Sequence, residues 1–573
     1  MEYEQFARQT RMALGLEPAD YVLKNARVVN VFSGEILKAD IALSGDTIVG
    51  VGEYSGTVEE DLREQYVCPG FIDSHLHFES TLVAPSELVA NAVAFGTTTY
   101  IADPHESANV CGLDGIEYIL RDTERSPANV YVMMPSCVPS APFEENGFHL
   151  SADQMAAYAQ HPRILGLGEV MDYRSVVTAE RAMFDKLELF RHKKLDGHAP
   201  FLREKEIAAY TLAGISTDHE CCDFDYALRE RRNGMQILIR EGTAAKNLEA
   251  IVSGIVSRGM DTTGFCFCTD DKHIEEIRRE GHISHCIKKA VALGLSPIQA
   301  IQMATVNAAW CYGLARLGAV APGYQADLVV LGDLETVAVQ RVYYKGRVVS
   351  EKNRPAGHQP IPCPNSIRNS VQIAPLTADS LALPVIEGQA FPVIQLLDGQ
   401  IVTQKRMEPV PCAGGSFCPD AVYNKIAVVE RHRATGHVGV GVLKGFSIQN
   451  GAIASSVSHD CHNIIVAGDN DADMIAAVQE LQRTQGGYAI ASGGRVLGSL
   501  PLPVMGLMSD AGFETVNATL CAMVQQAHQM GINPNIDPFI TLSFAALPVI
   551  PELRLTTRGI YDVGSERFLL KQN

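Results

Sequence analysis

The sequence contains no run of about 18 apolar residues, which is the length that a membrane-spanning helix requires. Its first twelve residues include Glu2, Glu4, Arg8 and Arg11 and have no apolar core, unlike a secretory signal. The 14 cysteines are scattered, without the Cys-x-x-Cys pairs that are typical of zinc knuckles and redox sites. We therefore expect a cytoplasmic protein with reduced cysteines and no membrane partner.

Basic residues are in the minority. The chain has 47 Lys and Arg against 66 Asp and Glu, which gives a formal net charge of −19. Because nucleic acids and anionic membranes bind basic surfaces, this balance argues against both as partners and favours a small substrate. The 46% hydrophobic and 20% charged residues are typical of a globular protein, and 573 residues leave room for several domains.

Short apolar runs that end in polar residues alternate with helical stretches over residues 70–319. The runs include TTTYIADP, NVYVMMPS, ILGLGEV, LDGHAP, GISTDHE, MQILIRE and TGFCFCTDD. Strands that alternate with helices form a parallel sheet, and roughly eight such units over about 250 residues predict a (β/α)₈ barrel, that is, a TIM-like α/β fold. In this fold the polar residues at the carboxyl ends of the strands face the active site.

Strand patterns flank the barrel on both sides. Residues 21–69 and residues 320–360 carry alternating apolar residues separated by turn residues, and we expect them to form one small, split β-sandwich domain. Residues 1–20 are expected to form a helical leader. A proline-rich stretch around residues 350–370 is typical of a linker, and residues 366–573 are expected to form a separate C-terminal α/β domain.

Two histidines, His75 and His77, end the first barrel strand in PGFIDSHLHFES. Their spacing points both imidazoles to one side of a strand, where two neutral histidines can bind a divalent metal. A His-x-His pair alone is equally compatible with a surface or core pair. However, four more possible ligands close later strands: Glu169, His198, His219 and Asp270. Four histidines and two carboxylates can hold two metals and leave open positions for water.

A second polar cluster, Asp103, His105 and Glu106 in ADPHES, follows the next barrel strand and should also face the barrel mouth. These residues can orient the ligands by hydrogen bonds or bind an extra metal. They can equally well be polar residues that cap a loop.

A third cluster, SHDCHN at residues 458–463, lies in the C-terminal domain. Adjacent residues rarely converge as a nucleophilic triad does. We expect His459, Asp460 and His462 to lie in a loop that helps to close the pocket, with a structural polar turn as the alternative. Two further histidines, His282 and His285, follow Asp270 in a helical stretch and are expected on its surface, although His282 can approach the site.

Taken together, these motifs resemble the amidohydrolase superfamily. The resemblance is carried by His-x-His after PGFID, single histidines after two later strands, an Asp after the last strand and the split β domain. Within the superfamily, the sequence resembles the bacterial adenine deaminase family over nearly its whole length. The matching motifs are DSHLHFEST, ADPHE, LGEVM, DGHAP, DHE, FCTDD and SHDCHN.

The resemblance implies a binuclear centre. His75, His77 and Asp270 would bind the more buried metal, His198 and His219 the second, and Glu169 would bridge them. Hydantoinases and dihydroorotases use a carboxylated lysine where this sequence has Glu169, which counts against those activities. The family implies Mn²⁺ or Fe²⁺ rather than Zn²⁺, although the ligand types permit all three. It also implies adenine as the substrate, and we expect a symmetric homo-oligomer.

The implied reaction is the hydrolytic deamination of adenine to hypoxanthine and ammonia. The metals would lower the pKa of a bound water from about 15.7 towards about 7, and the resulting hydroxide would attack the amine-bearing carbon. Asp270 would take a proton and pass it to the departing ammonia. Glu220, beside His219, would donate a proton to the adjacent ring nitrogen, which requires a raised pKa for this carboxyl group.

Alternatives from other classes stay open. An N-acetylamino-sugar deacetylase of the same superfamily uses a similar ligand set but needs basic residues for a sugar phosphate. Guanine and cytosine deaminases usually have a mononuclear site without the bridging Glu. A non-catalytic scaffold would have lost several ligands, whereas all of them are present here.

Overall fold

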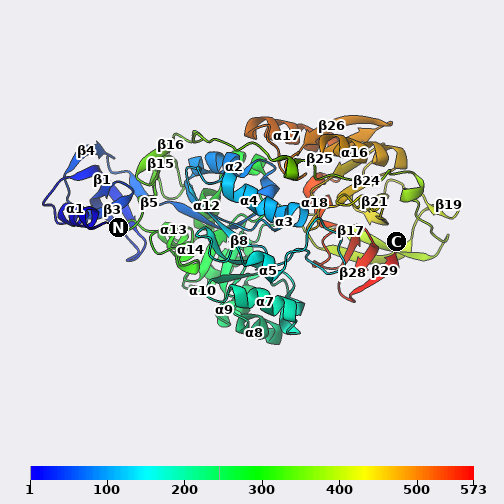
Figure 1. The fold of residues 1–573 in the computed structure, drawn as a ribbon, viewed down its shortest axis with the longest axis horizontal. Helices are drawn as coiled ribbons and strands as arrows, with labels where there is room; N and C mark the ends of the chain where they lie inside the picture. The colour runs from blue at the N-terminus through cyan, green and yellow to red at the C-terminus, as the bar shows by residue number, and fades with distance from the viewer. Residues whose placement is uncertain (1, 244, 573) are drawn as a thin grey trace.

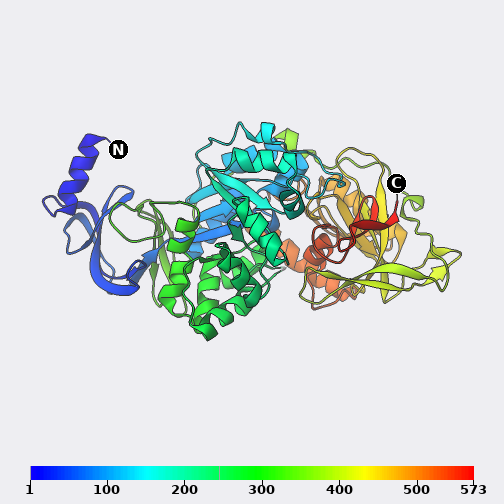
Figure 2. The ribbon, with the colours of Figure 1, turned by 90° about the horizontal axis from the view of Figure 1, so that it is seen from below.

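The computed structural model describes residues 2–243 and 245–572 and contains three bodies in a row. A small β domain at the N-terminal end, a barrel in the middle and a C-terminal α/β domain follow one another along the long axis (Figure 1). The view from below shows the same order (Figure 2). The barrel therefore contacts both neighbours, and the two smaller bodies lie at opposite ends.

The middle body is a closed barrel of eight parallel strands that are ordered as in the sequence. Its closure is made by hydrogen bonds between the ends of the first and last strands, since Asp270 N donates to His75 O at 3.0 Å. Ser216 N donates to Leu195 O at 3.1 Å between the fifth and sixth strands. The predicted (β/α)₈ barrel is confirmed. Its strands are β6 (Phe71–Leu76), β7 (Thr97–Ala102), β8 (Asn129–Met134), β9 (Ile164–Val170), β10 (Lys194–Gly197), β11 (Thr217–Asp218), β12 (Gln236–Arg240) and β13 (Phe265–Cys268).

Helices surround the barrel and bury one apolar face each. In α9, for example, the side chain of Asp223 accepts a hydrogen bond from Tyr226 N and caps the helix, which then buries Phe224 and Ala227. The helices of this body are η1 (Glu79–Thr81), α2 (Pro85–Ala92), η2 (Val93–Phe95), α3 (His105–Cys111), α4 (Leu113–Asp122), α5 (Ala152–Met155), α6 (Tyr173–Val177), α7 (Arg181–Leu189), α8 (Glu204–Leu212), α9 (Phe224–Arg232), α10 (Leu248–Arg258), α11 (Ile274–Glu280), α12 (Ile283–Ala292), α13 (Pro297–Met303) and α14 (Val306–Cys311).

The interior of the barrel is apolar at one end and polar at the other. Ile72, Ile101 and Leu238 form an apolar layer inside the barrel, and Ala308 at α14 packs against the same layer. The carboxyl ends of the strands carry histidines and carboxylates instead. Because this apolar layer fills the barrel interior, an active site can form only at the carboxyl ends of the strands.

The small β domain joins chain segments from both sides of the barrel. Leu328 of β14 pairs with Pro69 of β5, which links the stretches expected at residues 21–69 and 320–360 into one sheet. The N-terminal helix α1 (Tyr3–Ala13) ends before the first strand and buries Met12 in a cluster with residues of that sheet. The strands are β1 (Ala19–Asn30), β2 (Glu35–Ser44), β3 (Thr47–Gly52), β4 (Gly56–Asp61), β5 (Tyr66–Pro69), β14 (Leu328–Leu331), β15 (Val339–Tyr344) and β16 (Arg347–Glu351).

The C-terminal body is built on an eight-stranded, largely antiparallel sheet of order β18-β17-β22-β21-β24-β23-β25-β26. Its helices are α15 (Asn365–Arg368), η3 (Asp379–Leu381), α16 (Asp471–Thr484), α17 (Phe513–Gln529) and α18 (Pro538–Phe544). Its strands are β17 (Ala390–Leu396), β18 (Thr403–Pro409), β19 (Cys412–Ala413), β20 (Ser416–Phe417), β21 (Tyr423–Val429), β22 (Val438–Lys444), β23 (Ala452–Ser455), β24 (Ile464–Gly468), β25 (Gly487–Ser492), β26 (Arg495–Pro501), β27 (Leu553–Thr556), β28 (Gly559–Asp562) and β29 (Arg567–Lys571).

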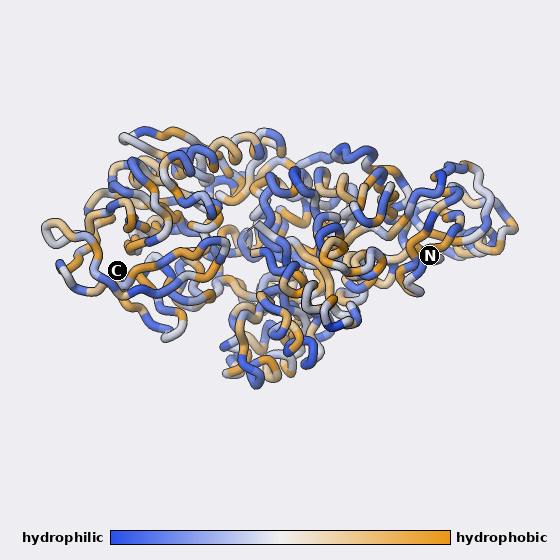
Figure 3. Tube along the Cα trace, turned by 180° about the vertical axis from the view of Figure 1, so that it is seen from behind, coloured by the Kyte–Doolittle hydropathy of each residue, from blue (hydrophilic) through white to orange (hydrophobic). Residues whose placement is uncertain are grey.

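Hydrophobic and hydrophilic residues alternate along the trace of all three bodies (Figure 3). Among the described residues, no helix combines the length and the apolar character that a membrane crossing would need.

Candidate active site

Six predicted ligands converge at the carboxyl ends of the barrel strands. Every one of them is at most 5% exposed. The strand order places them around one point, because neighbouring parallel strands end at the same rim. Asp270 adopts a φ of 54°, in the left-handed region that Asp tolerates better than most residues. The six residues are His75, His77, Glu169, His198, His219 and Asp270.

Glu169 lies between two sets of imidazoles. Its Oε1 is 3.4 Å from Nε2 of His77, whereas its Oε2 is 2.8 Å from Nδ1 of His198. The same Oε2 is 3.3 Å from Nε2 of His219. Each carboxylate oxygen therefore faces a different set of nitrogens, which is the arrangement that a bridging carboxylate requires.

Asp270 completes the first of these sets. Its Oδ1 is 3.4 Å from Nε2 of His75 and 3.2 Å from Nε2 of His77. The second nitrogen of His77, Nδ1, lies 2.8 Å from Asp103 O, a carbonyl that can only accept. The lone pair of His77 Nε2 is therefore free to point at the centre, as in metal-bound histidines.

The donor set fits a divalent metal centre. The Nε2 atoms of His75 and His77 lie 3.1 Å apart, and Oε1 of Glu169 is buried without a hydrogen-bond partner. Buried charges are costly unless they are paired or coordinate a metal. The groups of described residues around this point that could hold an ion include His75 with His219 and Asp270, His75 with His77 and Glu169, and Glu169 with His198 and His219.

Both acidic members of this donor set are held in the ionised form. Burial raises the pKa of Glu169, but the charge of His105 and the hydrogen bonds of His198 and His219 outweigh it and bring the pKa well below its usual range. Burial likewise raises the pKa of Asp270, and Arg240 with the neighbouring histidines lowers it well below the usual range. Metal ligands have to be deprotonated, so both residues are ready to bind.

Arg240, at the end of β12, is a site residue that the sequence analysis missed. Its Nη1 donates to Oδ2 of Asp270 at 3.0 Å and to Oε1 of Glu220, and its Nη2 donates to Oε2 of Glu220 at 3.2 Å. The run MQILIRE, in which Arg240 follows the apolar residues and precedes Glu241, contained the signal, since polar residues at strand ends face the site.

The direction of the pKa shift at Glu220 differs from the sequence-based expectation of a protonated carboxyl group. Burial raises the pKa of Glu220, but Arg240 and then His198 and His219 lower it overall. Glu220 is therefore a carboxylate in the free protein. The reason is the partner arginine on the neighbouring strand, which the local sequence around Glu220 does not contain.

Asp103 and His105 contact the ligands directly. Oδ2 of Asp103 accepts a hydrogen bond from Glu169 N at 2.8 Å, and Nδ1 of His105 is 3.1 Å from Oε1 of Glu169. The contact requires a glycine at position 168, because a Cβ on Gly168 would lie 2.1 Å from Oδ2 of Asp103. Glu106, the third residue of this cluster, points into the same cavity.

The loop of residues 458–463, between β23 and β24, reaches the barrel mouth. Oδ1 of Asp460 is 3.6 Å from Nε2 of His105, and Nδ1 of His459 is 3.8 Å from Oε1 of Glu106. The ring of Phe544, at the end of α18, stacks on His459 at 4.4 Å. The structure thus brings the C-terminal domain onto the predicted metal centre.

These groups line a cavity between the barrel and the C-terminal domain. Its floor is the histidine and carboxylate cluster, and Ile401, Phe544, Leu547 and Ile550 form an apolar roof. A cavity that combines apolar walls with a few convergent polar groups is the usual form of a small-molecule site.

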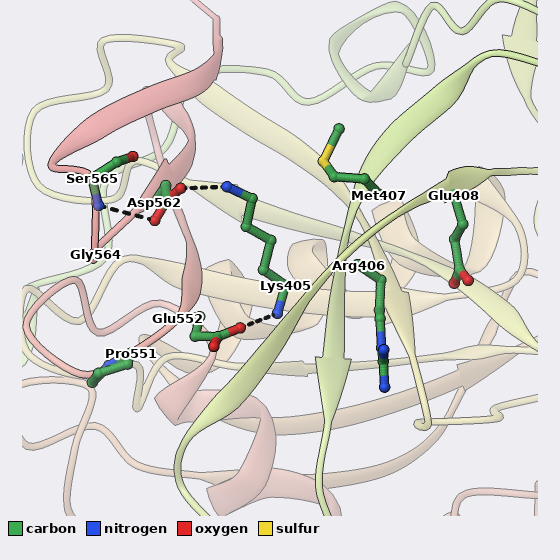
Figure 4. Close-up of a pocket in the computed structure, with 9 residues that line it drawn as sticks. All are labelled: Lys405, Arg406, Met407, Glu408, Pro551, Glu552, Asp562, Gly564 and Ser565. Atoms are coloured by element: carbon green, nitrogen blue, oxygen red, sulfur yellow. Dashed lines mark hydrogen bonds and ion pairs between the residues drawn. The ribbon is translucent and has the colours of Figure 1, made fainter.

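A more open hollow on the C-terminal domain offers no comparable chemistry (Figure 4). Its Lys405 is bound to Asp562 at 2.6 Å through Nζ and to Glu552 at 2.6 Å through the backbone nitrogen (Figure 4). The cavity over the histidine cluster is therefore the candidate active site.

The expectation that His282 lies on a helix surface is wrong. The side chain is buried at the start of α12, with Nδ1 3.0 Å from Thr97 Oγ1 and Nε2 3.3 Å from Oδ2 of Asp73. Burial lowers the pKa of His282 to about 3, so the imidazole is neutral. The helix packs its first turn against β6, and this long-range contact is invisible in the helical pattern. His285 is partly exposed, as expected.

Comparisons with known proteins agree over both halves of the chain. The model of the amidohydrolase family matches residues 66–349, and that of the adenine deaminase C-terminal domain matches residues 400–567. An adenine deaminase from Desulfitobacterium hafniense is 55% identical over 569 residues, which cover 99% of each chain. One from Clostridium acetobutylicum is 43% identical over 563 residues and covers 97% of this chain and 98% of its own. The chain therefore belongs to the adenine deaminase family of the amidohydrolases.

Proposed function

We propose that the chain catalyses the hydrolytic deamination of adenine to hypoxanthine and ammonia in the cavity at the barrel mouth. The observation that carries this proposal is the position of Glu169, whose two oxygens face separate sets of imidazoles next to Asp270. The relatives named adenine deaminase, which match over nearly the whole chain, support adenine as the substrate.

The six buried donors divide into two metal sites that share one carboxylate. His75, His77 and Asp270 would hold one ion, His198 and His219 would hold the other, and Glu169, whose two oxygens face the two sets, would be shared between them. Mn²⁺ or Fe²⁺ is the native ion in this proposal, although nitrogen and carboxylate donors also accept Zn²⁺. The bound ions would supply an activated water at neutral pH.

Two carboxylates then move the two protons of the attacking water. The water oxygen bonds to the carbon that carries the amine, and Asp270 takes one proton and delivers it to the amine, which leaves as ammonia. Glu220 enters as a carboxylate, takes the other proton and delivers it to the adjacent ring nitrogen, N1. The product is hypoxanthine with a carbonyl at the former amine position and a proton on N1.

Arg240 keeps both proton-carrying carboxylates, Glu220 and Asp270, ionised. Its guanidinium is buried and contacts Glu220 and Asp270 together, which holds both groups ionised and fixes their orientation. The carbon under attack has to lie within hydrogen-bond reach of both carboxylates, and the apolar roof excludes bulk water from this region.

The deacetylase alternative finds less support in the cavity. A sugar phosphate needs free basic groups, and Arg240, already engaged by two carboxylates, is the single Lys or Arg among the described residues that line the cavity. The scaffold alternative requires lost ligands, whereas the described structure contains the complete predicted set. We also propose a cytoplasmic homo-oligomer without nucleic acid or membrane partners, in line with the net charge of −19.

The test is ammonia release by purified protein that has been reloaded with Mn²⁺. Adenine, adenosine and an N-acetylamino-sugar phosphate are supplied in parallel. We expect metal-dependent release of ammonia from adenine and none from adenosine. Release of acetate from the sugar phosphate, with adenine left unchanged, would replace deamination by deacetylation.

A further inference from the structure

Glu106 is a buried acidic residue that the proposed deamination does not use. Its side chain is fully buried and lines the cavity, and its Oε2 has no hydrogen-bond partner among the described residues. Oγ of Ser80 lies 3.3 Å from its Oε1, and the single proton of this hydroxyl is shared with the nearer Oδ1 of Asp271. An unsatisfied buried carboxylate oxygen costs stability, so its persistence in a cavity points to a ligand that satisfies it.

A third metal is the first ligand to consider, because Glu106 lies near His459 and His462 of the C-terminal domain. The backbone N–H of Ser458, however, donates to Nδ1 of His462 at 3.1 Å. A neutral imidazole that accepts at Nδ1 carries its proton on Nε2, and that atom faces Oε2 of Glu106 at 3.5 Å. Nε2 of His462 therefore offers no lone pair to a metal, and at 3.5 Å it leaves Oε2 of Glu106 without a hydrogen bond.

Glu106 and Glu220 lie beside different histidines of the candidate centre. Glu220 is next to the second set of imidazoles, with Oε1 3.6 Å from Nε2 of His219. Glu106 instead groups with His77 and His105. Both side chains line the same cavity. A flat ring bound between them can therefore contact Glu220 with one edge and Glu106 with the other.

The purine ring has a nitrogen on each side of its amine-bearing carbon, N1 in the six-membered ring and N7 in the five-membered ring. The amine-bearing carbon C6 is bonded to N1 on one side and to C5, which carries N7, on the other side. A purine whose C6 lies over the centre and whose N1 faces Glu220 therefore directs N7 towards the side of Glu106.

We propose that Glu106 is a specificity-determining residue that hydrogen-bonds the N7 edge of the bound purine, with one proton shared between its carboxyl group and N7. Through this bond it selects rings with a nitrogen at this position and turns N1 towards Glu220. The proposal rests on adenine deamination at this site. Ser80 of the barrel contacts Oε1 of Glu106, and His462 of the C-terminal domain flanks Oε2 at 3.5 Å without a hydrogen bond.

The test compares adenine with 7-deazaadenine, in which N7 is replaced by C–H. Values of kcat/KM are measured for the Mn²⁺-loaded wild type and for Glu106→Leu. We expect the wild type to prefer adenine, and the preference to shrink at least about tenfold in Glu106→Leu, because a site built around a hydrogen bond discriminates strongly against its absence. Glu117→Leu, which removes an exposed carboxylate on the neighbouring helix α4, should leave the preference unchanged.

An unchanged preference in Glu106→Leu would overturn the role of Glu106 without affecting the proposed function. Failure of the wild type to deaminate adenine would instead overturn the proposed function. If Glu106→Leu does not fold, Glu106→Met provides the same loss of hydrogen bonding at a similar side-chain length. For this variant, inhibition by hypoxanthine is compared with inhibition by 7-deazahypoxanthine. We expect the preference for hypoxanthine to shrink relative to the wild type. An unchanged preference would contradict the proposal.

Discussion

Nη1 of Arg240 lies 3.0 Å from Oδ2 of Asp270, at the carboxyl ends of neighbouring strands β12 and β13. The same guanidinium also donates to Glu220. One buried cation therefore links the two carboxylates that we propose as proton carriers, and it offsets the rise in pKa that burial alone would cause.

Replacing Arg240 tests this coupling. In Arg240→Met, the charge that offsets the effect of burial on Glu220 is lost. The pKa of Glu220 therefore rises, and its ionised fraction at a given pH falls. We expect kcat/KM for adenine to fall at least about tenfold, and its acidic limb to move to higher pH. A pH–rate profile of the metal-loaded variant measures both effects. Arg232→Met, at an exposed arginine on α9, is the control, and an unshifted acidic limb in Arg240→Met would argue against the coupling.

The Asp270→Asn variant should lose turnover while it keeps most of its metal. Asp270 carries a proton in the proposed reaction, whereas His75, His77 and Glu169 remain as a group that could hold the ion. We expect kcat to drop by about 10²–10⁴ or more, the range for loss of an acid–base group. Steady-state kinetics and elemental analysis measure the two properties on the same sample. Near-normal activity would contradict the proton-carrier role.

Glu220→Gln should affect catalysis more than binding. The amide cannot take a proton from water and return it to N1, so we expect kcat to fall by about 10²–10⁴ with a small change in KM. The metal content should stay that of the wild type. A loss of less than tenfold would leave Glu220 as a residue that only orients its neighbours.

Glu144 gives a prediction about stability and pH. Burial raises its pKa to about 8, so between its unfolded value near 4.5 and pH 8 the folded protein binds more protons at this group. Stability is therefore lost as the pH rises through this range, by up to a few kcal/mol.

Thermal unfolding between pH 5 and pH 8 measures this loss of stability. The melting temperature of wild type should fall more steeply with pH than that of Glu144→Gln, and exposed Glu124→Gln should follow wild type. Parallel curves for wild type and Glu144→Gln would show that the Glu144 carboxyl does not carry the loss.

Local patterns were sufficient to predict the barrel and its six converging donors. Alternating strands and helices specify the barrel, and the barrel in turn places strand ends such as those of His75 and Glu169 at one rim. Arg240 followed the same rule, but an arginine after an apolar strand is typical of a surface position, so its inward orientation depended on partners from other strands.

Contacts between distant segments account for what the sequence did not predict. His282 is buried because α12 docks on β6, and the shift at Glu220 depends on Arg240. The loop with His459 contacts Glu106, which lies more than 350 residues earlier in the chain, because the C-terminal domain packs against the barrel. Such placements come from tertiary packing, which local periodicity does not encode.

The most direct test of the account is a titration of metal-free protein with Mn²⁺, with adenine deamination measured at each step. Because Glu169 faces two separate sets of imidazoles, activity should rise until two ions are bound per chain, and Glu169→Gln should bind less metal and stay inactive. Full activity with a single ion per chain, or adenine turnover without metal, would contradict the proposed binuclear centre.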